Sequence, residues 1–183
     1  MNKLTVILVF VFMLAGNSYA FTDAEKLKNS GMAYYQAAMY EKAAEKFSKS
    51  IDLEPSYGAY LYRGQAYCFI KLYDQAISDF TEAIHINSND VAAYAERGNA
   101  YALKGWYNQA FYDLNQAISM KPDDGLSYLY RAKAYYETQE YKLAWTDLKQ
   151  AKVFGQPVSD EVMELYQRKA LKVPAKKKSF FSF

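Results

Sequence analysis

The sequence predicts an all-α protein built as a solenoid of about four helical hairpins closed by a final helix. The first observation is a column of small residues, which are Gly31, Gly64, Gly98 and Ala132. Tyrosine columns share the same period, at Tyr34, Tyr67, Tyr101 and Tyr135 and at Tyr40, Tyr73, Tyr107 and Tyr141. Two further columns follow it, at Ala43, Ala76, Ala110 and Ala144 and at Phe47, Phe80, Leu114 and Leu148. Five columns with one spacing indicate a repeated helix pair.

The N-terminus has the pattern of a secretory signal peptide. Lys3 gives a basic start, residues 4–16 are almost all apolar, and the small residues Ser18 and Ala20 precede the expected cleavage point. We expect cleavage near Ala20 and export to the periplasm or out of the cell. The alternative is an uncleaved membrane tether, although the run 4–16 is shorter than the roughly 20 apolar residues of a spanning helix. Asn17 stands where a lipoprotein signal needs cysteine, so lipidation there is excluded.

The charge and cysteine content argue against electrostatic binding of nucleic acid and against stabilisation by an internal disulfide. The formal net charge is +2 and falls to +1 without Lys3, so no global field favours nucleic acid or an anionic membrane. Cys68 is the single cysteine and cannot form an internal disulfide, so the core must supply the stability of an exported protein.

Each repeat is expected to contain two helices. In the third repeat Tyr94, Gly98 and Tyr101 mark one face of the first helix, and Ala110 and Leu114 mark a face of the second. Gly98 and Ala110 are expected where the paired helices approach closely. The expected segments are the signal peptide 1–20, repeats 24–56, 57–90, 91–124 and 125–158, the capping helix 160–172 and a tail 173–183.

This pattern resembles the tetratricopeptide repeat (TPR) family over about residues 24–158. The resemblance is carried by Tyr60, Gly64, Tyr67, Tyr73, Ala76, Phe80 and Ala83 in the second repeat and by Tyr94, Gly98, Tyr101, Tyr107, Ala110, Leu114, Ala117 and Pro122 in the third. Ala132 departs from the expected glycine, and Ser88 stands where the first and third repeats have Pro55 and Pro122. The resemblance implies a right-handed superhelix that binds another protein or peptide, with no enzymatic activity and no cofactor.

Three arginine–aspartate pairs are predicted to close the last three hairpins. The pairs are Arg63 with Asp79, Arg97 with Asp113, and Arg131 with Asp147. The first repeat has Ser30 and Lys46 at these two positions, so both partners are lost together. Pairing within one repeat explains this joint loss, and a structural role follows.

By the same resemblance, ligands are expected on the face of the first helices that packing leaves free. The predicted groove residues are Met32, Tyr35, Gln36, Leu61, Gln65, Phe69, Ala95, Asn99, Leu103, Leu126, Leu129, Lys133 and Tyr136. Several of these are apolar where exposed helices usually carry charge, and exposed apolar clusters mark interaction surfaces. The leucines 61, 103, 126 and 129 and Phe69 are therefore expected to face solvent. The alternative is that a second protomer or the N-terminal segment covers this face, in a self-associating structural subunit.

Family members that dock chaperones hold a peptide's terminal carboxylate with lysine and asparagine residues. Here Lys28 is present, but Met32, Leu126 and Tyr130 replace the other residues of that set. We therefore expect an extended or helical peptide held in apolar pockets, with Gln65 and Asn99 hydrogen-bonded to its backbone.

No catalytic site is predicted. Cys68 follows a scaffold tyrosine on a first helix, while His85 lies near the end of a second helix, so the two are not expected to share a pocket. The sequence contains neither a glycine-rich phosphate loop nor a metal-binding cluster of histidine and cysteine.

The last hairpin of a solenoid needs a cap. Ser159 followed by Asp160 and Glu161 is a favourable helix start, which predicts the capping helix 160–172. Residues Lys176–Phe183 combine three lysines with three phenylalanines. This tail is expected to be a solvated end, and the alternative is weak docking to an anionic membrane or a partner.

Overall fold

The computed structural model describes residues 21–172 of the 183-residue chain. The predicted signal peptide 1–20 and tail 173–183 lie outside the described residues. Across residues 21–172, no helix is both long and apolar enough to cross a membrane.

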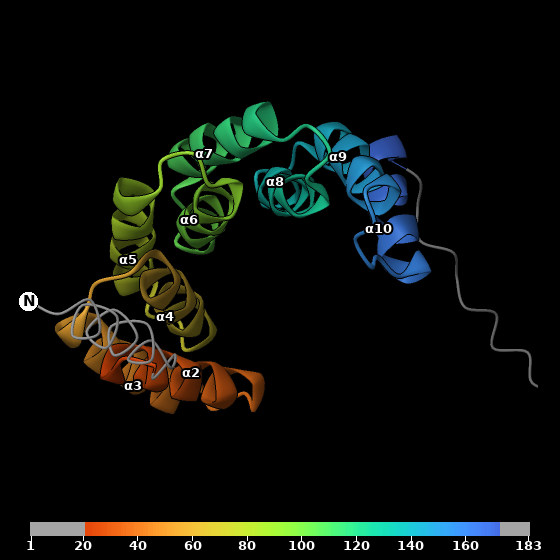
Figure 1. Ribbon diagram of the computed structural model, residues 1–183. Coiled ribbons are helices and arrows are strands. Elements are labelled where there is room, and N and C mark those ends of the chain that lie inside the picture. The colour runs from red at the N-terminus through yellow and green to blue at the C-terminus, as the bar shows by residue number, and fades with distance from the viewer. Residues whose placement is uncertain (1–20, 173–183) are drawn as a thin grey trace, which may run out of the picture.

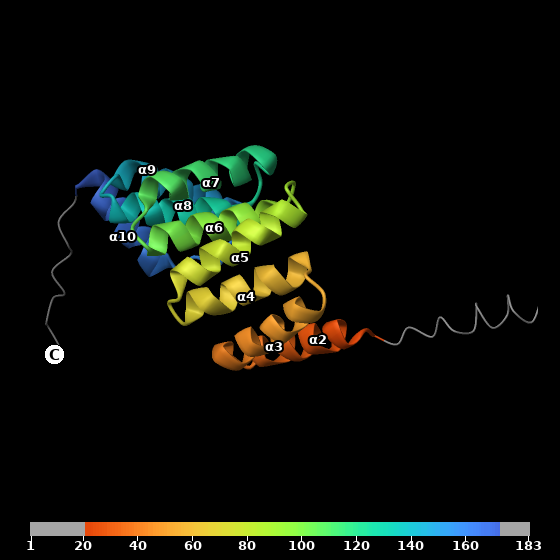
Figure 2. The same cartoon turned by 90° about the vertical axis from the view of Figure 1, so that its left-hand side faces the viewer.

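The described part of the chain is entirely helical. Its helices are α2 (Asp23–Gln36), α3 (Tyr40–Leu53), α4 (Tyr57–Phe69), α5 (Tyr73–Ile86), α6 (Val91–Leu103), α7 (Tyr107–Met120), α8 (Gly125–Glu137), α9 (Tyr141–Val153) and α10 (Asp160–Leu171). Consecutive helices pair as four hairpins, and α10 follows the last one. The hairpins lie side by side along an arc, with α4, α6 and α8 on its inner side and α5, α7 and α9 outside (Figure 1). The same stack is seen from the side in Figure 2. The predicted all-α solenoid of about four hairpins with a closing helix is confirmed.

Side-chain caps begin two of the inner helices. The Asp90 carboxylate accepts hydrogen bonds from the backbone N–H groups of Ala92 (2.8 Å) and Ala93 (3.2 Å), which have no partner inside α6. Asp124 caps α8 in the same way. The inner helix α4 starts without a side-chain cap, so packing must define its start.

The paired helices touch where the small residues recur. A Cβ atom on Gly64 would lie 2.7 Å from Cε1 of Phe80, and one on Gly98 would lie 2.7 Å from Cγ of Leu114. Gly31 stands in the same relation to Phe47. Real Cβ atoms do not approach so closely, so glycine lets the backbones come together around a fully buried large side chain. The close approach predicted from the sequence is confirmed.

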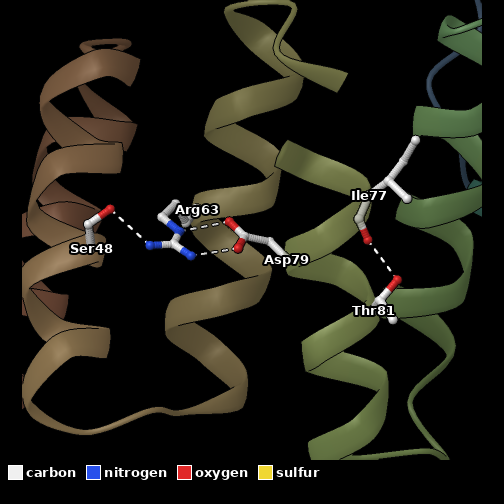
Figure 3. Close-up of polar contacts among 5 residues, drawn as sticks. All are labelled: Ser48, Arg63, Ile77, Asp79 and Thr81. Atoms are coloured by element: carbon white, nitrogen blue, oxygen red, sulfur yellow. Dashed lines mark hydrogen bonds and ion pairs between the residues drawn. The ribbon is translucent and has the colours of Figure 1, made fainter. Parts of the chain in front are cut away.

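The three arginine–aspartate pairs form as predicted. Arg63 donates to Asp79 through Nε (2.8 Å) and Nη2 (2.7 Å), and its Nη1 donates to Oγ of Ser48 in the preceding hairpin at 2.9 Å (Figure 3). Arg97 and Arg131 make the same bidentate contacts with their aspartates, and their third donors reach Thr81 and Asn115. Thr81 in turn donates to the backbone carbonyl of Ile77 (Figure 3). Each arginine therefore closes its own hairpin and links it to the one before, which the sequence pattern did not predict.

The end of the stack is covered by α10. Oγ of Ser159 accepts a hydrogen bond from the backbone N–H of Val162 at 3.4 Å. Tyr166 is buried and its ring stacks on Tyr136 with centroids 4.5 Å apart. The helix ends at Leu171, one residue before the predicted bound.

Asp113→Ala should lower the free energy of unfolding by about 3 kcal/mol, because Arg97 would keep a buried charge without its partner. The Asp113 side chain is only 2% exposed. Chemical denaturation of the variant and the wild type measures the difference.

Asp74→Ala is the control, since Asp74 pairs with Lys104 but is 71% exposed. Exposed pairs contribute little, so this change should be small. Equal losses for the two variants would contradict the structural role of the buried pairs.

Candidate peptide-binding groove

The inner surface of the arc carries two adjoining cavities. The larger has a volume of about 350 Å³ and is lined by Tyr35, Gln65, Cys68, Phe69, Glu96, Asn99, Leu103, Tyr130 and Lys133. The second, of about 300 Å³, is lined by Asn99, Ala102, Leu103, Tyr107, Lys133, Ala134, Glu137 and Tyr166. Asn99, Leu103 and Lys133 belong to both, so the two cavities form one continuous groove along α4, α6 and α8. We call this surface the groove.

Six of the predicted groove residues line the larger cavity together. They are Tyr35, Gln65, Phe69, Asn99, Leu103 and Lys133. Phe69 is 57% exposed and Leu103 is 50% exposed, so two large apolar side chains face solvent on neighbouring helices. Their positions agree with the expectation of exposed apolar residues on this face.

Two predicted residues do not reach the groove. Leu61 is only 7% exposed and Ala95 is fully buried. Leu61 packs in a core cluster with Phe80 and Ala93, where α4 meets α5 and α6. The prediction that Leu61 faces solvent is wrong, because this face of the first helix packs against the next hairpin.

The remaining predicted residues line neither cavity. Met32 and Leu129 are half-buried and pack against core clusters. Leu126 is also half-buried, and Gln36 is exposed at the end of α2. Tyr136 stacks on Tyr166 of the closing helix.

Glu96 is the functional candidate that sequence reasoning missed. It lines the larger cavity but is only 7% exposed. Nε2 of Gln65 donates to Glu96 Oε1 at 2.8 Å, and the hydroxyl of Tyr130 lies 3.4 Å from Oε2. These three residues come from α4, α6 and α8, so one polar network spans three hairpins. Glu96 occupies the repeat position that holds Tyr62 and Tyr130 in the adjacent repeats. This replacement of tyrosine by an acid is the sequence feature that could have indicated a special role.

Burial shapes the ionisation of the groove. Desolvation raises the pKa of Glu96, against the opposing effect of hydrogen bonds from Gln65 and Tyr130 and of the charge on Lys133. Burial also raises the pKa of the Cys68 thiol to about 12 and that of Tyr35 to about 12, with the Glu96 charge adding to both. At neutral pH Cys68 is therefore a protonated thiol, which is a poor nucleophile.

One wall of the groove is aromatic. Tyr40 stacks on Phe69 with ring centroids 4.2 Å apart, and Tyr35 contacts Phe69 edge-on at 5.9 Å. On the other side, Nζ of Lys133 lies 5.6 Å from the ring centroid of Tyr130. The groove thus combines aromatic faces, an amide, a buried acid and one exposed lysine.

The structure places Cys68 and His85 apart. Cys68 lines the groove, whereas the His85 side chain is 66% exposed on α5 and lies 3.8 Å from Glu82. Within residues 21–172, histidine, cysteine, aspartate and glutamate form no group of three or more that could hold a metal ion.

No family model matches the chain. It is 37% identical over 75 residues to protein unc-45 homolog B of Mus musculus, and 37% identical over 75 residues to the same protein of Homo sapiens. Each alignment covers 39% of this chain and 8% of the relative. The chain therefore spans under a tenth of the curated relatives it matches.

Solved structures share the fold over most of the described helices. MamA is similar at 26% identity with a TM-score of 0.64, covering 72% of this chain and 78% of that one. The second TPR domain of human RPAP3, solved with the HSP70 peptide SGPTIEEVD, has 26% identity and a TM-score of 0.59, covering 61% of this chain and 93% of that one. The fold is of the TPR type. A thermophilic TPR protein of Thermus thermophilus, TTC0263, has a TM-score of 0.70 at 19% identity, covering 81% of this chain and 82% of that one.

Glu96→Gln should raise the melting temperature at neutral pH. The folded state raises the Glu96 pKa above its ordinary value of 4.5, so ionisation costs the wild type stability as the pH rises through and above that value. Gln can still accept a hydrogen bond from Gln65 without carrying charge. Thermal unfolding at pH 4 and pH 7.5 should show a difference that grows with pH.

Glu137→Gln is the matched control, because Glu137 lines the second cavity but is exposed. It should show a much smaller pH-dependent difference. A Glu96→Gln variant that is less stable than the wild type at pH 7.5 would contradict the cost assigned to the buried charge.

Proposed function

We propose that this chain is a binding scaffold that holds a peptide segment of a partner protein in the groove. The observation that carries the proposal is the side-by-side exposure of Phe69 and Leu103 over a cavity that also presents the amide of Asn99. Apolar side chains supply binding free energy when a partner covers them, and an amide can pair with the partner's backbone.

The RPAP3 domain supports the proposal, since it has the same fold and was solved with a bound peptide. That peptide ends in EEVD and is acidic. This chain lacks the matching chemistry, because the positions that chaperone-docking members use for the terminal carboxylate include the apolar residues Met32 and Leu126, and Glu96 in the groove would repel a carboxylate. A peptide of different composition is therefore proposed.

The proposed partner is a separate protein, and the proposal assigns the groove no catalytic step. A second copy of this chain is the alternative occupant, in which case the groove would be buried in a dimer. Light scattering on the purified protein distinguishes a monomer with a free groove from such a dimer.

Leu103→Gln should weaken partner binding about tenfold, because an uncharged polar side chain would replace apolar contact area at the centre of the groove. Photo-crosslinking in cells with the reactive residue at Phe69 measures capture directly. Phe69 is a suitable position because it is exposed, and a photo-reactive phenylalanine derivative keeps its aromatic ring.

Leu53→Gln is the control, since Leu53 is 60% exposed at the end of α3 and does not line the groove. It should leave capture unchanged. Crosslinked products that persist in Leu103→Gln, or that contain only a second copy of the chain, would overturn the proposal.

We also propose that the protein acts in the cell envelope or outside the cell, in assembly of a complex. The basic, apolar and small-residue pattern of residues 1–20 supports export. N-terminal sequencing of the protein recovered from the envelope fraction should begin at Phe21. An intact Met1 would favour the uncleaved tether, and recovery from the cytoplasm alone would contradict export.

A further inference from the structure

Four carboxylates are buried in residues 21–172, and one of them differs from the others. Asp79, Asp113 and Asp147 each receive two hydrogen bonds from an arginine. Glu96 is buried to a similar degree but makes no ion pair with a cation of the described chain within 4.0 Å. A buried carboxylate without a cation is costly to a fold. Unlike the three aspartates, Glu96 therefore does not stabilise the fold through an ion pair.

The two donors to Glu96 are neutral and leave one oxygen weakly bonded. Oε1 accepts a short hydrogen bond from Gln65, while Oε2 has only the Tyr130 hydroxyl at 3.4 Å. Both donors also line the larger cavity. A carboxylate oxygen can accept two hydrogen bonds, so Oε2 keeps capacity for a donor that enters the cavity.

The surroundings of Glu96 suit a positively charged donor. Tyr35, Phe69 and Tyr130 bring aromatic rings to the same cavity, and ring faces attract cations. The Tyr130 ring already has the Lys133 ammonium 5.6 Å from its centroid. Lys133 is exposed on the rim and does not reach the carboxylate, so it screens Glu96 without pairing with it.

We propose that the groove receives a lysine or arginine side chain of the partner peptide, whose cationic head pairs with Glu96. This inference rests on the proposed function. The alkyl stem of either side chain would lie against Phe69 and Leu103, and basic side chains commonly bury such stems on apolar surface. Flanking apolar residues of the peptide would occupy the second cavity, beside Tyr107 and Tyr166.

The probe is a phage-displayed library of random ten-residue peptides selected on the immobilised full chain. Selected peptides should carry lysine or arginine next to apolar residues. One selected peptide is then synthesised with its basic residue intact or replaced by norleucine, which keeps the stem and removes the charge. Fluorescence polarisation gives the Kd of each peptide for the wild type and for Glu96→Gln.

Norleucine should weaken binding to the wild type roughly tenfold or more, as for loss of a charge-assisted hydrogen bond. It should have little effect on Glu96→Gln. Lys133→Gln should tighten binding of the basic peptide, because it removes a like charge from the groove.

The outcomes separate the two proposals. Selection of no peptide, or binding unaffected by Leu103→Gln, which removes apolar area without adding a charge, overturns the groove as a binding site and this inference with it. Selected peptides without basic residues, or an equal norleucine effect on Glu96→Gln, overturn the cation assignment and leave groove binding intact. Acidic peptides that Lys133→Gln weakens would assign the site to an anion. A dimer that Glu96→Gln dissociates would assign it to a second copy.

Discussion

The close contact between paired helices is the constraint on which the rest of the structure depends. At Gly31, Gly64 and Gly98 a side chain would collide with the large residue of the opposing helix. The contact fixes the distance and angle within each hairpin, and so it fixes which face of the first helix remains free. The arginine–aspartate pairs then set the relation between hairpins, because each arginine also reaches the preceding one. The groove is the surface left on the inner side once both requirements are met.

The residues of the inner surface that are suited to binding a partner reduce the stability of the free protein. Tyrosines and alanines elsewhere on the first helices pack into the core, and the buried aspartates are neutralised. Glu96 instead keeps a carboxylate in a partly desolvated cavity with only neutral donors, and burial raises its pKa. A residue that costs stability in the free protein is more readily explained by a function than by the fold. The same holds for Phe69 and Leu103, which leave apolar area in contact with water.

Much of this architecture could be predicted from the sequence, because a contact that recurs in each hairpin places the same residue types at a fixed spacing. The glycine column and the hairpins follow from the period, and the pairing of Arg97 with Asp113 follows from the joint loss of both partners in the first repeat. The closing helix follows from its own start, where Ser159 precedes two acidic residues. Leu61 was misplaced, because a helix in a solenoid packs on two neighbours and periodicity alone does not separate its second buried face from its free one. Glu96 was missed for a different reason. Its role depends on Gln65 and Tyr130 in other repeats, and a contact made once in the chain leaves no recurring pattern.

A partner peptide that lies in the groove beside Glu96 should change the environment of the methyl groups around it. NMR of methyl-labelled protein, with and without a selected lysine-containing peptide, measures this directly. We expect the methyl signals of Leu103, Ala102 and Ala134 to shift on titration, while those of Leu53 and Val153, exposed outside the groove, stay in place. Shifts confined to Leu53 and Val153, with Leu103 unchanged, would contradict binding in the groove.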